Sequence, residues 1–114
     1  MSYVIHSSKD FDVSFKKLSK RHRSIREDLA AFINTLREDP MQGVELSPGI
    51  RKIRMAITSK GRGKSGGVRV ITANAIIAEH EGHIALLTIY DKADSSTVKL
   101  NVIKKMARDL GFEL

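Results

Sequence analysis

The chain contains no cysteine among its 114 residues. It therefore cannot form a disulfide framework or a catalytic site that depends on a thiol. It also contains no run of about 18 apolar residues, so we expect no membrane-spanning helix. The opening residues, MSYVIHSSKDFD, lack a basic stretch followed by an apolar one, and so predict no export signal. These absences favour a cytoplasmic protein.

Acidic residues are missing from the middle of the chain, between Glu45 and Glu79. The same segment contains seven basic residues: Arg51, Lys52, Arg54, Lys60, Arg62, Lys64 and Arg69. The other 13 basic residues equal the 13 acidic ones in number, so this segment accounts for the whole net charge of +7. Such segregation favours binding to a polyanion, first RNA or DNA and second an acidic protein. A solvated basic surface is the alternative, although such surfaces usually mix both signs.

The length and a hydrophobic content of 41% predict a single globular domain over residues 1–114. Residues 3–5 favour an edge strand, and apolar residues at helical spacing then predict two helices joined as a hairpin. We expect the hairpin turn at residues 20–23, a capping box from Ser24 to Glu27, and the end of the second helix at Asp39-Pro40.

The second half of the chain predicts three strands and a helix. Residues 50–57, 68–78 and 84–90 are expected to be strands, with Glu81-Gly82 as the turn between the last two. A final amphipathic helix is expected from about Thr97 to Leu110, followed by Gly111 as its C′ residue. The sequence therefore predicts an α+β domain, in which an N-terminal strand and an αα-hairpin pack on a mostly antiparallel sheet and a helix ends the chain.

The basic, glycine-rich stretch KGRGKSGGVRV covers residues 60–70 and contains parts of two nucleotide-binding motifs. A P-loop requires glycine five residues before Gly63, where this chain has Thr58. Both the P-loop and the dinucleotide fingerprint require a helix after the glycines, but a strand is predicted there. We expect instead a hairpin loop whose Lys60, Arg62 and Lys64 contact an extended phosphate backbone.

Several segments in order resemble the RelE/ParE toxin superfamily, most closely its HigB-like members. They are IRKIRMA at residues 50–56, GRGKSGGVRVI at residues 61–71 and LTIYDK at residues 87–92, with Leu36, Asp39, Pro40, Gly43 and Leu46 before them. The resemblance implies the RelE-like fold and the toxin of a bacterial type II toxin–antitoxin pair. RelE-like members cut mRNA in the ribosomal A site, and HigB-like toxins usually pair with a helix-turn-helix antitoxin.

The same resemblance implies the site residues. The arginine of the GxR motif is catalytic in RelE-like members and corresponds to Arg69, while basic residues of the neighbouring strands correspond to Lys52, Arg54 and Lys92. Metal-free RNA cleavage needs phosphorane stabilisation and proton transfer. We therefore assign Arg69 and Arg54 to the phosphate, and Lys52 and Lys92 to proton transfer. RelE itself has a tyrosine early in its last helix, where this chain has Val98 or its neighbours.

The remaining binding residues are expected to contact RNA. They are Arg51, Lys60, Arg62, Lys64 and Tyr90, of which Tyr90 could stack on a base or be a core tyrosine. Glu79, His80, Glu81 and His83 lack the spacing of a metal site, and we expect neither a metal nor another cofactor. His6 and His22 stand alone in the sequence, and we expect them to be structural or exposed. Two other functions are open: a ParE-like toxin that poisons DNA gyrase, and a noncatalytic RNA-binding module or inactivated toxin.

Overall fold

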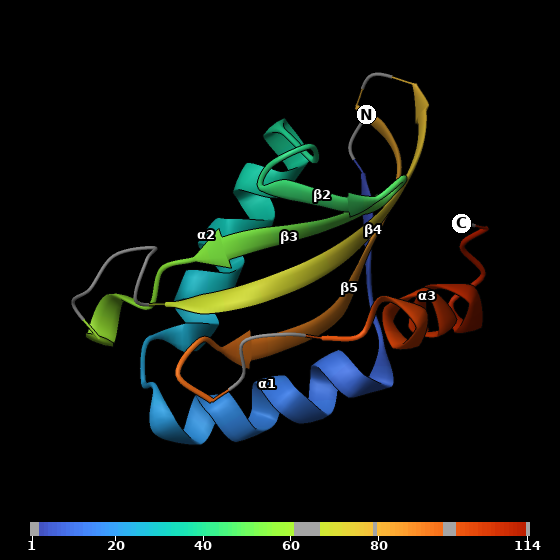
Figure 1. The fold of residues 1–114 in the computed structure, drawn as a ribbon. Helices are drawn as coiled ribbons and strands as arrows, with labels where there is room; N and C mark the ends of the chain where they lie inside the picture. Colours follow the sequence, from blue (N-terminus) through green and yellow to red (C-terminus); the bar gives the residue numbers. More distant parts are fainter. Residues whose placement is uncertain (1–2, 61–66, 79, 95–97, 114) are drawn as a thin grey trace.

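The computed structural model describes residues 3–60, 67–78, 80–94 and 98–113 (Figure 1). The elements follow one another as β1 (Val4–Ser7), α1 (Lys9–Arg21), α2 (Ile25–Glu38), β2 (Val44–Ser47), β3 (Ile50–Met55), the short 3₁₀ turn η1 (Thr58–Lys60), β4 (Val68–Ala78), β5 (Glu81–Asp91) and α3 (Leu100–Asp109). The strands form one sheet in the order β1-β5-β4-β3-β2. Only β1 and β5 pair in parallel, and the other pairs are antiparallel. No helix in these described ranges is long and apolar enough to span a membrane.

The α+β class with a mostly antiparallel sheet is thus confirmed, and β1 lies at an edge of the sheet as expected. The predicted order was wrong by one strand, because β2 was not anticipated. β2 has only four residues, and its exposed half leaves no clear period-two pattern. Pro48 and Gly49 connect it to β3, and Gly49 takes the positive φ of 81° that the tight connection requires.

The turn between β4 and β5 also differs from the prediction. Glu81 and Gly82 belong to β5, where they pair with Ala78 and Ile76, and the left-handed conformation falls on His80 with φ 58°. Gly82 has a different reason to be glycine: a Cβ there would lie 2.4 Å from the carbonyl oxygen of Ala75. The glycine therefore marks close approach of two strands rather than their turn.

The start of α2 also differs from the prediction. Ser24 does not form the predicted capping box: its backbone is already near-helical (φ −90°, ψ −3°), and its hydroxyl makes no capping bond to the helix. The hydroxyl donates to Asp28 and accepts from the Ser59 N–H. The side-chain cap of the hairpin lies instead at Ser8, which accepts from the Phe11 N–H at the start of α1.

The other helix ends are closer to expectation. α1 continues to Arg21, so the hairpin turn begins later than residue 20. α3 begins at Leu100, and the predicted start at Thr97 lies outside the described residues. Gly111 has the expected left-handed φ of 89°, and the Phe112 N–H donates to the Ala107 carbonyl at 3.0 Å, as in a Schellman ending.

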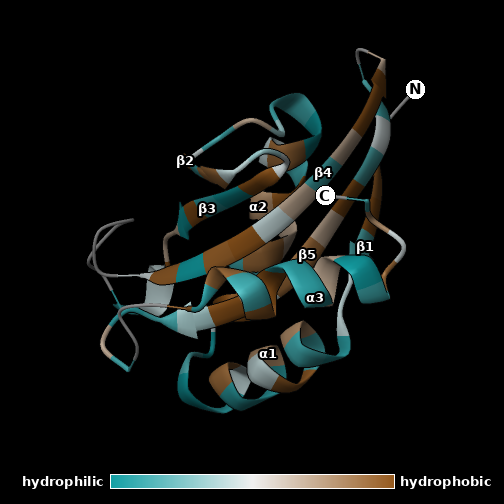
Figure 2. Ribbon diagram, turned by 45° about the vertical axis from the view of Figure 1, so that its right-hand side comes forward, coloured by the Kyte–Doolittle hydropathy of each residue, from teal (hydrophilic) through white to brown (hydrophobic). Residues whose placement is uncertain are grey.

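The two faces of the sheet are covered unequally. The α1–α2 hairpin packs on one face, where Phe11, Leu18, Ile25, Phe32 and Leu36 meet inward side chains of β3, β4 and β5. On the other face α3 contributes Ile103, Ala107 and the following Phe112 to a smaller core with Ile50, Ile71, Ala73, Ala85 and Leu87. Figures 1 and 2 show α2 behind the sheet and α3 in front of only part of it. The part of this second face that α3 leaves uncovered is where the candidate site lies.

Candidate functional site

Three strands place polar side chains in a row across the uncovered part of the sheet. Arg54 of β3 is the direct partner of Arg69 of β4, and Arg69 is the direct partner of Tyr90 of β5. Directly opposite residues in a sheet point to the same face, with Cβ atoms about 5 Å apart. Lys52 lies two residues before Arg54 on the same face, and Lys92 lies two residues after Tyr90. The alternation therefore brings all four predicted catalytic residues and Tyr90 to one surface.

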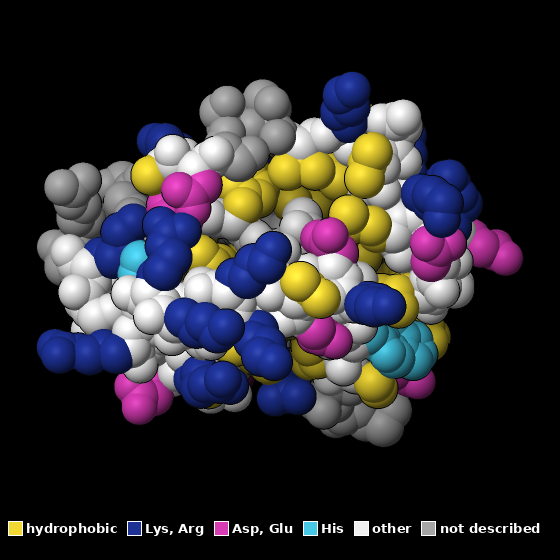
Figure 3. Space-filling model, turned by 90° about the horizontal axis from the view of Figure 1, so that it is seen from below, with side chains coloured by type: hydrophobic (Ala, Val, Ile, Leu, Met, Phe, Trp, Pro, Cys, Tyr) yellow, Lys and Arg dark blue, Asp and Glu magenta, His cyan; other side chains and the backbone are white. Residues whose placement is uncertain are grey.

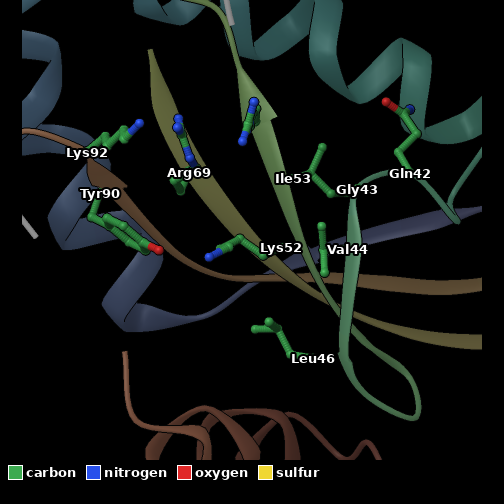
Figure 4. A pocket seen from close by; sticks show the side chains of 10 residues that line it. Gln42, Gly43, Val44, Leu46, Lys52, Ile53, Arg69, Tyr90 and Lys92 are labelled. Atoms are coloured by element: carbon green, nitrogen blue, oxygen red, sulfur yellow. The ribbon is translucent and has the colours of Figure 1, made fainter. Parts of the chain in front are cut away.

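These side chains line a pocket of about 490 Å³. Its wall is completed by residues before and within β2 and by one β3 residue: Gln42, Gly43, Val44, Leu46 and Ile53. In Figure 4 the Tyr90 hydroxyl and the Lys52 amino group point into the space between them, while Val44 and Leu46 stand on the opposite side. The pocket thus has a cationic side built by β3, β4 and β5 and an apolar side built by β2.

The charge of the pocket is of one sign. Its described lining holds two arginines and two lysines and no acidic residue. Like charges directly opposite on neighbouring strands destabilise a sheet, and a bound anion relieves that repulsion. Burial raises the pKa of Tyr90, and the positive charge of Arg69 partly opposes this rise. The tyrosine therefore stays neutral at physiological pH, able to donate a hydrogen bond.

Arg69 is the most deeply placed of the four cations. Only 5% of its surface is exposed, and its neighbours along β4 are the fully buried Val68 and Val70. Nη1 lies 3.4 Å from the Val68 carbonyl oxygen. A guanidinium held in a partly dehydrated setting interacts more strongly with a phosphate than one in open solvent, because the effective dielectric constant is lower. Arg69 is therefore a candidate phosphate ligand at the most buried position among the cations of the pocket.

Asp91 holds the end of β5 on the face of the strand that points away from the pocket. The side chain of Asp91 is 2% exposed and accepts from Lys60 Nζ at 3.1 and 3.3 Å and from the Ala93 N–H at 3.0 Å. His22 Nε2 lies 3.3 Å away, and Arg21 Nη2 lies 3.6 Å away. Burial alone would raise the pKa of Asp91, but the hydrogen bonds from Ala93, Lys60 and His22 and the charge of Lys60 lower it. Asp91 thus fixes the strand segment that presents Tyr90 and Lys92 to the pocket.

The structure does not bring every predicted binding residue to the pocket. Lys60 is engaged by Asp91, on the face opposite Tyr90. Arg51 donates through Nε to the Gln42 carbonyl at 2.7 Å and through Nη2 to the Gly43 carbonyl at 3.1 Å, so it fastens the segment before β2. Arg62 and Lys64 lie outside the described residues. Of the predicted residues that the structure describes, five line the pocket, while Arg51 and Lys60 hold neighbouring segments.

The apolar wall was not identified as part of a site from sequence. Val44 is 61% exposed although it is hydrophobic, and it faces the cations across the pocket. Gly43 comes so close to β3 that a Cβ would lie 2.2 Å from the Lys52 carbonyl oxygen. Gly43 and Leu46 were noted only as members of the family-like segment, which was the one available signal. An exposed valine gives no such signal, because single exposed apolar residues are common.

Several histidines have partners that the sequence did not indicate. His6 Nε2 and His83 Nδ1 are 2.9 Å apart, and the rings are stacked between β1 and β5. His22 contacts Asp91, as described above. His6 and His22 therefore both make contacts within the fold, which agrees with a structural role for residues that stand alone in the sequence. No group of three or more metal-ligating side chains is found among the described residues.

Chemically, the pocket can bind a phosphodiester together with a base. The two arginines and two lysines supply donors for phosphate oxygens, while the Tyr90 ring and the wall of Val44 and Leu46 supply apolar surface for a base. The described lining offers no carboxylate or imidazole, so the lysines and Tyr90 are the groups there that can exchange a proton. Comparisons of the chain with protein-family models and with curated proteins found no match.

Proposed function

We propose that this chain is a RelE-like toxin that cuts mRNA on the ribosome without a metal ion and so inhibits translation. The observation that carries the proposal is the row of Arg54, Arg69 and Tyr90 across three strands, with Lys52 and Lys92 on the same face. Such a row suits a single RNA strand, because it offers several phosphate ligands beside one stacking surface. The likeness of the segments around these residues to HigB-like toxins supports the same activity.

The reaction proceeds by attack of an RNA 2′-oxygen on the neighbouring phosphorus. A bond forms between that oxygen and phosphorus, the bond to the 5′-oxygen breaks, and a proton moves from the 2′-hydroxyl to the leaving oxygen through protein groups. Arg69 and Arg54 stabilise the charge on the phosphorane oxygens. Lys52 and Lys92 are the candidates for proton transfer, and Tyr90 holds a neighbouring base. The products are a 2′,3′-cyclic phosphate and a 5′-hydroxyl.

The ribosome has a defined part in this proposal. The described pocket lining offers no carboxylate or imidazole as a base, so cleavage depends on precise placement of the 2′-hydroxyl in line with the leaving oxygen. Ribosome-bound mRNA has a fixed backbone, which supplies that placement. As a toxin, the protein would be kept inactive by a cognate antitoxin, which we propose to be of the helix-turn-helix type.

Controlled induction of the protein in bacteria, followed by genome-wide mapping of mRNA 5′ ends, tests the function. Breaks at particular codons within translated regions, with arrest of protein synthesis, are expected. Intact mRNA with gyrase-linked DNA breaks would instead indicate a ParE-like toxin. Intact mRNA and intact DNA would indicate a noncatalytic RNA-binding module.

A further inference from the structure

A second basic surface lies outside the pocket, on the α1–α2 hairpin. Between residues 13 and 26 the chain has six basic residues and no acidic one. These residues, called the hairpin patch below, are Lys16, Lys17, Lys20, Arg21, Arg23 and Arg26. The charge sum of the whole chain conceals this patch, because acidic residues elsewhere balance it. The positive charge of the chain is therefore not confined to the segment between Glu45 and Glu79, as the charge sum alone suggests.

All six side chains of the hairpin patch are exposed. The apolar residues between them, Leu18 and Ile25, are buried against the sheet, so the amphipathic helices direct the cations outward. Figure 3 views the molecule from below Figure 1, and much of the Lys and Arg surface there gathers on one side around a histidine. Within the described part of the chain, Arg21 is the one member of the patch that forms an ion pair, with Asp91 and Asp94.

The hairpin patch adjoins the pocket at the end of β5. Asp91 faces Arg21 and His22 on one side of the strand, while Tyr90 and Lys92 face the pocket on the other. The two cationic surfaces are thus joined through a single strand end. Asp91 and Asp94, the acidic residues described at this junction, both pair with Arg21.

The composition of the patch favours nucleic acid over protein as its partner. Protein interfaces are enriched at their centre in aromatic and apolar residues and depleted in lysine. The patch contains three lysines, and the one large hydrophobic side chain between residues 13 and 26 that is highly exposed is Val13, at the start of the segment. Long, separately hydrated cations are suited to phosphates of a backbone, whose binding releases counterions and requires no close packing.

We propose that the hairpin patch binds the phosphate backbone of folded, double-helical RNA while the pocket holds a single strand. This proposal rests on the proposed function only because it takes RNA as the polyanion. The role that it gives the hairpin patch is binding, and cleavage stays in the pocket. Two surfaces for two forms of RNA would let the protein dock on structured RNA and direct a nearby single strand into the pocket.

The test compares two variants with equal loss of charge. The patch variant carries Lys16→Gln, Lys17→Gln and Lys20→Gln, and the control carries Lys9→Gln, Lys99→Gln and Arg108→Gln, all at exposed positions. Binding of each protein to a labelled, fully paired RNA hairpin is measured over a series of KCl concentrations. We expect the patch variant to bind at least about tenfold more weakly at low salt. The slope of log K against log [KCl] should also fall in magnitude by about two to three. We expect the control to change by less than about threefold.

Equal weakening of both variants would overturn the proposal, because only overall charge would then matter. It would also be overturned if the patch variant lost binding to polyglutamate but kept its affinity for the RNA hairpin, since the partner would then be an acidic protein. Thermal melting of both variants checks that the exposed substitutions leave the fold intact. If the wild type fails to cut mRNA but the patch variant still loses RNA binding, the proposed function fails and the docking surface stands.

Discussion

Arg54 and Arg69 are direct cross-strand neighbours on β3 and β4, and both face the same pocket. Two like charges at such a position oppose the pairing of their strands. The described pocket lining contains no acidic residue. An anion bound between the two guanidinium groups would relieve their repulsion, which leads to a stability prediction that does not depend on any activity.

Sulfate should stabilise the protein more than chloride does at equal ionic strength. An anion present at ten times its Kd adds about 1.4 kcal/mol to the free energy of unfolding. The variant Arg54→Gln should be more stable than the wild type in chloride by about 0.2–1 kcal/mol, because the repulsion is removed. It should also lose most of the extra stabilisation by sulfate. Thermal melting of both proteins in the two salts measures this, and an equal sulfate effect in both would argue against an anion site here.

Tyr90 should contribute to binding through its ring rather than through its hydroxyl. Replacing it with alanine should weaken binding of a short single-stranded RNA by about 1–3 kcal/mol, the usual contribution of one stacked base. The variant Tyr90→Phe keeps the ring and should stay close to the wild type. Fluorescence anisotropy with one RNA and all three proteins provides the comparison. Equal loss in both variants would point to the hydroxyl instead.

Asp91 should make stability depend on pH in the acidic range. Because its pKa is lowered in the folded state, the ionised carboxyl stabilises the fold above the ordinary value of 3.8, and this contribution is lost as the pH falls below it. At pH 7 the variant Asp91→Asn should lose about 1–3 kcal/mol, and the loss should shrink towards pH 3. Urea unfolding at several pH values tests this.

A matched control for Asp91 is Asp94, which also pairs with Arg21 but whose side chain is 52% exposed. Asp94→Asn should change stability little at any pH, because exposed ion pairs contribute little. A pH-independent loss in Asp91→Asn would show that the carboxylate charge is not what holds the end of β5.

Gly43 should be intolerant of any side chain. An alanine there would place its Cβ 2.2 Å from the Lys52 carbonyl oxygen and would have to accept a φ of 77°. We expect Gly43→Ala to lose about 2 kcal/mol or more, from both the clash and the strain. Gly111 has a similar φ of 89° but no atom within 4 Å of the added Cβ. Gly111→Ala should therefore lose only about 1 kcal/mol, and denaturant unfolding of the pair separates clash from strain.

The period-two pattern of β3 is the clearest case in which sequence predicted structure. It placed Ile53, Met55 and Ile57 in the core and Lys52 and Arg54 on the other face, as observed. Arg69 could be singled out because a cation inside an apolar strand must face a site, a partner or solvent. These predictions succeed because strand alternation is local and does not depend on distant residues.

The features that sequence missed depend on contacts between distant segments. Lys60 lies in a basic stretch, but its partner Asp91 is 31 residues away and turns it from the pocket. The apolar wall at Val44 exists because β2 folds against β3, and the pocket is open because α3 covers only part of the sheet. Neither fact can be read from composition or periodicity, since both are set by tertiary packing.

The proposed function requires that the pocket cuts RNA and that Arg69 stabilises the reacting phosphate. The most direct measurement is the 5′-end analysis of one mRNA in a purified translation reaction, with wild type, Arg69→Ala and the exposed-site control Arg108→Ala. We predict breaks bearing 5′-hydroxyl ends with the wild type and the control, and a rate at least about 100-fold lower with Arg69→Ala. Cleavage by Arg69→Ala at the wild-type rate would show that Arg69 does not stabilise the reacting phosphate, and no cleavage by the wild type would show that the proposed function is wrong.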